Sequence, residues 1–113
     1  MKPSFQKCAV FALLLVLLGA IHTSAQTLDR GAIHGFVYDS SGSAVPGVKV
    51  TLTNPATGLR RELVTDENGA YDFEALVPSV YTVKFESDSF NSYTVKQIVV
   101  TIGSSLALDA HMK

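Results

Sequence analysis

The chain has 113 residues, with nine Lys and Arg against ten Asp and Glu, and a single Cys. This length allows one domain at most. A formal net charge of −1 argues against nucleic acid as a partner, because phosphate binding needs a surplus of Lys and Arg. One Cys excludes a disulfide framework, and an apolar fraction of 47% is too high for a disordered chain. We therefore expect one small globular domain.

Residues 1–25 have the pattern of a secretory signal peptide. A segment with two Lys is followed by an apolar run from Cys8 to Ile21, and Thr23-Ser24-Ala25 supplies the small residues of a cleavage site. The run of 14 residues is shorter than the roughly 20 that a membrane-spanning helix needs, so a transmembrane anchor is the weaker interpretation. A lipoprotein signal is excluded because the Cys precedes the apolar run. We expect a helical signal peptide over residues 1–25.

Removal of that segment leaves residues 26–113, which contain seven Lys and Arg against ten Asp and Glu and no Cys. The mature chain then has neither thiol chemistry nor a disulfide. An exported chain without Cys suits a bacterial envelope better than a small eukaryotic secreted protein, which often needs cross-links. We expect one exported domain without a membrane span, located in the periplasm, at the outer membrane or outside the cell.

After Gln26 the apolar residues alternate with period two, which predicts strands rather than helices. Seven short runs of this kind favour a β-sandwich or a barrel. In chain order they are Ile33–Val37, Val48–Leu52, Leu59–Val64, Tyr71–Phe73, Tyr81–Phe85, Ile98–Ile102 and Leu106–Ala110.

Residues typical of turns separate the alternating runs. Clusters of this type occupy Asp39–Ser43, Asn54–Gly58 and Gly103–Ser105. Asp66–Gly69 fits a hairpin turn, in which the Asp carboxylate caps the turn and Gly69 takes a positive φ. The chain contains no low-complexity linker and no internal repeat, so the turns divide one domain.

Five motifs follow one another along this part of the chain. They are GAIHGFVYD from Gly31, GSAVPGVKV from Gly42, NPATG from Asn54, TDENGAYDF from Thr65 and LVPSVY from Leu76. In this order they resemble the carboxypeptidase regulatory-like domain over nearly all of residues 31–112. The resemblance implies an all-β fold, a seven-stranded transthyretin-like or immunoglobulin-like β-sandwich. It also points to the N-terminus of TonB-dependent outer-membrane receptors, where similar copies directly follow a signal peptide.

Several motif residues have a physical reason for their identity. Gly35 lacks a side chain within a strand, so a neighbouring element can approach closely. Tyr71 and Phe73 share one strand face and can bury their rings against a facing sheet. Tyr81 follows Pro78 by three residues, a spacing that suits a ring packed under a corner with its hydroxyl bonded to loop backbone.

The chain departs from the family pattern at two places. Ser79 stands where the family usually has Gly, and Asp88-Ser89-Phe90 stands where a Gly-Phe pair is usual. If position 79 needs a positive φ, Ser79 carries a strain of about 1 kcal/mol or more. Both departures concern local geometry and leave the expected fold unchanged.

The residue types of catalytic and metal sites occur only singly. His34 and His111 do not have the spacing of a zinc site, which needs three or four ligands. Serines fall in turns, without the elbow motif of a serine nucleophile. Asp66, Asn68 and Asp72 offer oxygen ligands for calcium, but the loop pattern is incomplete and a turn explains them. We expect no enzymatic activity, no catalytic residue, no cofactor and no metal.

His34, Phe36 and Tyr38 share one face of the first predicted strand. If Ile33 and Val37 point inward, these three side chains point outward and form an aromatic stripe. The sequence leaves open the alternative that they are buried under a loop or a curled sheet edge. An exposed stripe is a candidate binding surface, because contiguous apolar surface usually marks an interface. Aromatic rings also stack on sugar rings.

The resemblance implies a non-catalytic interaction or accessory module of the bacterial cell envelope. Because 113 residues are too few for a receptor's plug and barrel, we expect either a stand-alone domain or the front piece of an interrupted reading frame. The alternative is a carbohydrate-binding module that acts through His34, Phe36 and Tyr38. The expected partner is an envelope protein or a glycan, and a protein partner has the further option of adding a strand to an open sheet edge.

Overall fold

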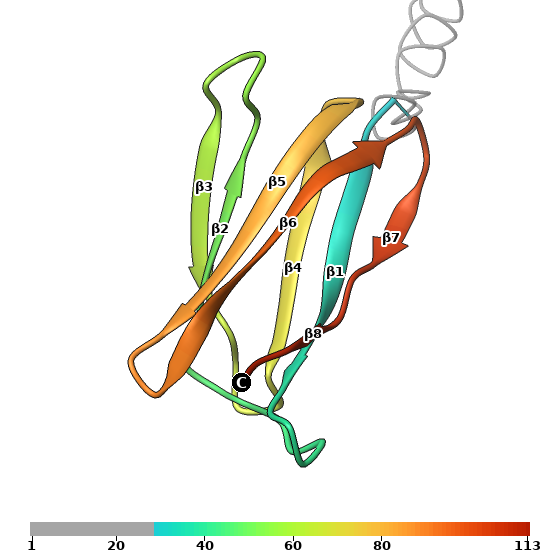
Figure 1. The fold of residues 1–113 in the computed structure, drawn as a ribbon. Coiled ribbons are helices and arrows are strands. Elements are labelled where there is room, and N and C mark those ends of the chain that lie inside the picture. The colour runs from blue at the N-terminus through green and yellow to red at the C-terminus, as the bar shows by residue number, and fades with distance from the viewer. Residues whose placement is uncertain (1–28) are drawn as a thin grey trace, which may run out of the picture.

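The computed structural model describes residues 29–113, which form two facing β-sheets (Figure 1). The first sheet has the order β4-β1-β7, with β8 also beside β1, and the second has the order β3-β2-β5-β6. The predicted all-β sandwich is confirmed, and the predicted signal peptide lies outside the described residues. The strands are β1 (Gly31–Tyr38), β2 (Lys49–Thr53), β3 (Arg60–Val64), β4 (Ala70–Leu76), β5 (Ser79–Ser87), β6 (Phe90–Val100), β7 (Ser105–Ala107) and β8 (Ala110–His111).

The core lies between the two sheets and follows the predicted alternation. Tyr71 and Phe73 are almost fully buried, as expected, and the Tyr71 ring meets the Phe85 ring edge-on at 5.4 Å between centroids. Aliphatic side chains from both sheets fill the remaining space, so residues 29–113 contain a complete hydrophobic core. The fully buried aliphatic residues include Ile33, Val37, Val48, Val50, Leu52, Val83, Ala110 and Met112.

The last predicted strand is divided into β7 and β8. Both pieces run parallel to β1 and keep the same residue offset from it. Between them, Leu108 and Asp109 leave the ladder beside Gly35. A Cβ atom at Gly35 would lie 2.0 Å from the carbonyl oxygen of Leu108, so no side chain fits there. The expected close approach at Gly35 is therefore confirmed.

The bounds predicted for the sixth strand are wrong at both ends. The sequence predicts Ile98–Ile102, whereas β6 begins at Phe90 and ends at Val100, so the two share only Ile98–Val100. Two β-bulges interrupt its pairing with β5, and Gln97 takes a φ of 57° at one of them. An extra residue in a strand breaks the period-two pattern on which the prediction depended. Ile102 lies in the following turn and is 68% exposed.

The turn at residues 66–69 is not a hairpin, because it joins β3 in the second sheet to β4 in the first. Its local chemistry is nevertheless as expected. The Asp66 carboxylate accepts hydrogen bonds from the backbone N–H groups of Asn68 and Ala70, at 2.8 and 2.9 Å. Gly69 has a φ of +72°. Turn residues specify the local bend, and they do not specify which sheet the next strand joins.

The corner between β4 and β5 confirms one expectation and corrects another. The Tyr81 hydroxyl donates a hydrogen bond of 2.5 Å to the carbonyl of Val77, as expected from its spacing to Pro78. Ser79 does not have a positive φ, so the strain considered for it is absent. The strained residue is Ala75, with a φ of 55°, next to a register shift between β4 and β1.

Replacing Gly35 by Ala tests the close approach of Leu108. We expect Gly35→Ala to lower the free energy of unfolding by about 1–3 kcal/mol, because overpacking forces the backbone of two strands apart. Gly58→Ala is the control, since its Cβ would meet nothing within 4 Å and only the positive φ of +77° is penalised. Urea unfolding of residues 26–113 measures both, and an equal or smaller loss for Gly35→Ala would contradict the packing account.

Candidate functional site

The aromatic stripe lies on the outer face of the first sheet, along β1. Phe36 is 41% exposed, and His34 and Tyr38 are half-buried. The Phe36 and Tyr38 rings stack with 6.2 Å between centroids. Because β1 lies between β4 and β7, the stripe runs down the middle of the face instead of under a curled edge. The structure thus brings the three predicted residues together on an open surface.

Residues from neighbouring strands extend the stripe. His111 on β8 lies beside Tyr38, with ring centroids 5.5 Å apart. The Ser105 hydroxyl on β7 lies 3.1 Å from Nδ1 of His34, and Asp72 on β4 is the cross-strand neighbour of His34. No local pattern in the sequence indicates that His111 belongs to this surface, because only the parallel pairing of β8 with β1 brings it there.

Hydrogen bonds at the break between β7 and β8 fix the backbone under the stripe. The Asp109 carboxylate accepts the Phe36 N–H at 2.9 Å, and the Leu108 N–H donates to the His34 carbonyl at 2.7 Å. From the core side, the Tyr71 hydroxyl donates to the Leu108 carbonyl. Burial raises the pKa of Tyr71, and the negative charge of Asp109 adds to the rise. The backbone beneath the stripe is therefore fixed by hydrogen bonds from the β7–β8 connection, and that connection is itself bonded to Tyr71 in the core.

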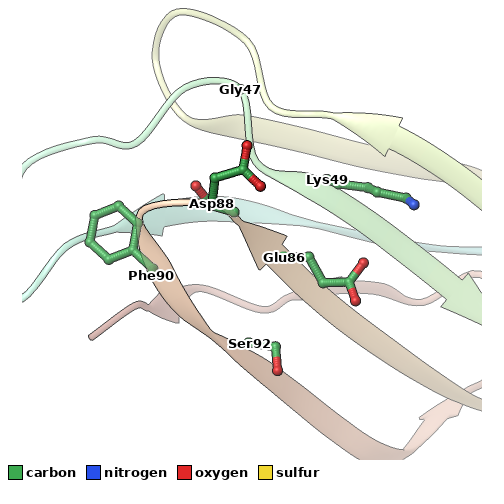
Figure 2. A pocket seen from close by; sticks show the side chains of 7 residues that line it. Gly47, Lys49, Glu86, Asp88, Phe90 and Ser92 are labelled. Atoms are coloured by element: carbon green, nitrogen blue, oxygen red, sulfur yellow. The ribbon is translucent and has the colours of Figure 1, made fainter.

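A second candidate is a polar hollow of about 530 Å³ where β2, β5 and β6 meet. Figure 2 shows Lys49, Glu86 and Asp88 among its lining residues. Lys49 forms an ion pair of 2.9 Å with Glu62, and Lys84 one of 2.7 Å with Glu86. Exposed ion pairs of this kind contribute little and mark a solvated face. This hollow is the weaker candidate because two of its three charged lining residues, Lys49 and Glu86, already form ion pairs.

These exposed pairs also account for the acidity of their carboxyl groups. A hydrogen bond from Lys49 lowers the pKa of Glu62, and a hydrogen bond from Lys84 lowers that of Glu86. Both carboxylates are therefore ionised at neutral pH, so they act as solvated charges and not as proton donors. Asp72 lies on the exposed side of β4, as predicted.

The residues considered for metal binding do not come together. Within residues 29–113, no group of three or more His, Cys, Asp or Glu side chains lies in an arrangement able to hold a metal ion. The Asp66 carboxylate, considered for calcium, is instead bonded to the backbone of its own turn. In the same part of the chain, no helix is long and apolar enough to cross a membrane.

Comparisons with known proteins match most of the chain. The sequence profile of the carboxypeptidase regulatory-like domain matches residues 32–113. The TonB-dependent transporter Oar of Myxococcus xanthus is 28% identical over 99 residues, which make up 87% of this chain. Those residues are only 9% of the transporter, so the chain corresponds to a small part of that protein.

Solved structures share the fold. A protein of Bacteroides uniformis for which carbohydrate binding is proposed aligns with a TM-score of 0.60 and 22% identity, over 74% of this chain and 41% of that protein. Catechol 1,2-dioxygenase of Acinetobacter aligns with a TM-score of 0.57 and 13% identity, over 80% of this chain and 54% of the enzyme. At these identities the likeness concerns the fold alone.

Tyr71 generates a prediction about alkaline pH. Its raised pKa means that it stays protonated in the folded state above pH 10.0, its ordinary value, while the unfolded chain loses that proton. The free energy of unfolding therefore falls as pH rises beyond this value. Tyr71→Phe makes the fall shallower, and it costs about 1 kcal/mol at neutral pH because the Leu108 carbonyl loses its donor.

Urea unfolding of both proteins between neutral pH and a pH of about 11 measures this effect, since ordinary tyrosines ionise near pH 10. Tyr93→Phe serves as the control, because that ring is 41% exposed. An alkaline slope that is the same for Tyr71→Phe and for the unaltered protein would contradict the assignment to Tyr71.

Proposed function

Because the chain belongs to the carboxypeptidase regulatory-like domain family, we propose that it is a non-catalytic recognition module of the bacterial cell envelope. Residues 1–25 direct its export, and residues 26–113 bind an envelope protein or a glycan. The binding surface is the aromatic stripe His34, Phe36 and Tyr38. The relation to a TonB-dependent transporter supports an envelope location, and the leader-like sequence supports export.

The observation that carries the proposal is the stacked pair Phe36 and Tyr38 on the middle strand of an open sheet face. Aromatic rings supply a large contact area with few rotatable bonds, so little side-chain entropy is lost on binding. Both rings already touch neighbours in the unbound protein, which lowers that cost further. A face of this kind is prepared for a flat or extended partner.

The edge strands of both sheets disfavour the addition of a partner strand. This supports recognition through the sheet face. Edge strands invite pairing unless charges, bulges or short length protect them. In the second sheet, β3 carries Arg60, Arg61 and Glu62, and β6 is bulged twice. In the first sheet, β7 is three residues long and β4 carries Asp72 and Glu74. Each edge thus has a feature that disfavours an added strand.

The contact of Ser105 with His34 is the arrangement that most resembles catalytic machinery. A serine nucleophile needs a base that a third group orients, and donors for the oxyanion. Asp72 is the neighbour of His34 on β4, yet no hydrogen bond or ion pair joins them among the described residues. The pair lies on an open sheet face, which supports a binding role for His34.

Carbohydrate binding is the second candidate, and the composition of the same face favours it. The Phe36 and Tyr38 rings form a stacking platform, and the polar side chains Asp109 and His111 lie at its border. Sugars present apolar C–H faces to rings and hydroxyl groups to carboxylates and imidazoles. The fold shared with the Bacteroides uniformis protein supports this candidate.

Joint replacement of the stripe by Ser tests the proposal. We expect residues 26–113 to be retained on one of two matrices, immobilised envelope protein or immobilised envelope polysaccharide. His34→Ser/Phe36→Ser/Tyr38→Ser should weaken that retention at least about tenfold, because central aromatic residues carry most of the binding energy. Retention by the polysaccharide matrix identifies the carbohydrate-binding candidate, and retention by the protein matrix identifies the first one.

The control variant replaces three exposed Val residues on the second sheet, Val64→Ser/Val80→Ser/Val99→Ser. It has the same number of apolar-to-Ser changes on the opposite side of the sandwich and should bind as the unaltered protein does. Circular dichroism melting confirms that both variants fold. Unchanged retention of the folded stripe variant would remove the stripe as the site.

A further inference from the structure

The strands of the two sheets differ in charge. Within the described strands, every Lys and Arg belongs to the second sheet, and these residues are Lys49, Arg60, Arg61, Lys84 and Lys96. The first sheet has two carboxylates on β4, Asp72 and Glu74, and the connection between β7 and β8 adds Asp109. All three residues are exposed. The outer face of the first sheet, which bears the aromatic stripe, therefore carries carboxylates without Lys or Arg.

The two cations outside the strands lie at the beginning and at the end of the described chain. Arg30 precedes β1 and forms an ion pair of 3.7 Å with Asp29. The Lys113 carbonyl accepts the Asn91 N–H at 2.9 Å, so the backbone turns toward β6 of the second sheet after β8. Neither residue belongs to a strand of the first sheet, and the negative character of its outer face remains.

Two of the three carboxylates are available to bind a cation. Arg61 donates to the backbone carbonyl of Glu74 at 2.7 Å, which places a guanidinium beside that residue and balances part of its charge. Within residues 29–113, neither Asp72 nor Asp109 forms an ion pair. Asp109 uses one oxygen, Oδ1, to accept the Phe36 N–H, so its second oxygen can accept a donor from a partner.

The two available carboxylates lie on opposite sides of the Phe36 ring. Asp109 approaches Phe36 from the β7–β8 side through its hydrogen bond of 2.9 Å. On the other side, Phe36 pairs with Ala70 and His34 pairs with Asp72, so Asp72 is the diagonal neighbour of Phe36. Diagonal neighbours on one sheet face lie about 7–8 Å apart, within reach of long side chains. An exposed ring thus stands between two carboxylates.

We propose, on the basis of the function proposed above, that the stripe binds an Arg side chain in a basic segment of an envelope protein. The guanidinium lies on the face of the stacked Phe36 and Tyr38 rings, and its N–H groups donate to Asp72 or Asp109. Arg fits better than Lys because its planar group stacks on rings and presents donors in a fixed fork. A neutral sugar can use the rings but not the charge of the carboxylates.

NMR titration of isotope-labelled residues 26–113 tests the proposal. The probe is a short peptide in which Arg alternates with Ser, and the reference peptide has Gln in place of each Arg. The measurement is made at about pH 8, where histidine is generally neutral. We expect the arginine peptide to shift the amide signals of Phe36, Tyr38 and His111, with binding that weakens as salt is added. The glutamine peptide should leave these signals in place.

Two double variants separate the contributions of charge and rings. Asp72→Asn/Asp109→Asn should weaken binding of the arginine peptide about three- to tenfold, because exposed ion pairs each contribute modestly. Asn retains an oxygen that can accept the Phe36 N–H, so the variant keeps the bond that the fold uses. Phe36→Leu/Tyr38→Leu should weaken binding as well, because Leu keeps apolar area without a ring face for the cation.

The matched control is Glu62→Gln/Glu86→Gln, which makes the same change of net charge on the second sheet and should leave binding unchanged. Circular dichroism melting shows that each variant folds. Binding that Asp72→Asn/Asp109→Asn does not weaken would overturn the proposal, as would shifts confined to the second sheet. If the stripe is needed for retention by the envelope matrices and millimolar arginine peptide shifts no stripe signal, the cationic partner is refuted while the proposed function stands.

Discussion

The missing side chain at Gly35 is the constraint on which the first sheet depends. The Leu108 carbonyl occupies the space that a Cβ would fill, and the Tyr71 hydroxyl bonds that carbonyl from the core. This contact lets β7 and β8 stay in one register with β1 although the chain leaves the ladder between them. As a result Ala110 closes the core on one side, and His111 reaches Tyr38 on the other.

The two faces of β1 lie in different environments, one in the core and one at the surface. Its inward residues Ile33 and Val37 are fully buried, and its outward residues form the aromatic stripe. A strand in the middle of a sheet is held by ladders on both sides, so a surface built on it is rigid. Rigid support reduces the entropy lost on binding. Under the proposed function, the eight residues of β1 combine a structural strand with a recognition surface.

The sequence was most informative where the alternation is regular and least informative where distant strands meet. The sequence predicts the strands around Val50 and Phe85 because apolar residues alternate with polar ones there, although Thr51 in the first of them is itself buried. The bulge at Gln97 hid the beginning of β6, since an inserted residue reverses the pattern. His111 was missed as part of the stripe because parallel pairing with β1 has no local sequence signal.

The central claim is that the outer face of β1 contacts a partner in the envelope. A photo-crosslinking amino acid placed at Phe36, with the same amino acid at Val64 as the reference position, tests this claim in living cells. The account predicts a discrete adduct from position 36 and none from position 64, because only the first lies on the stripe. An adduct from position 64 alone, or no adduct from position 36, would contradict it.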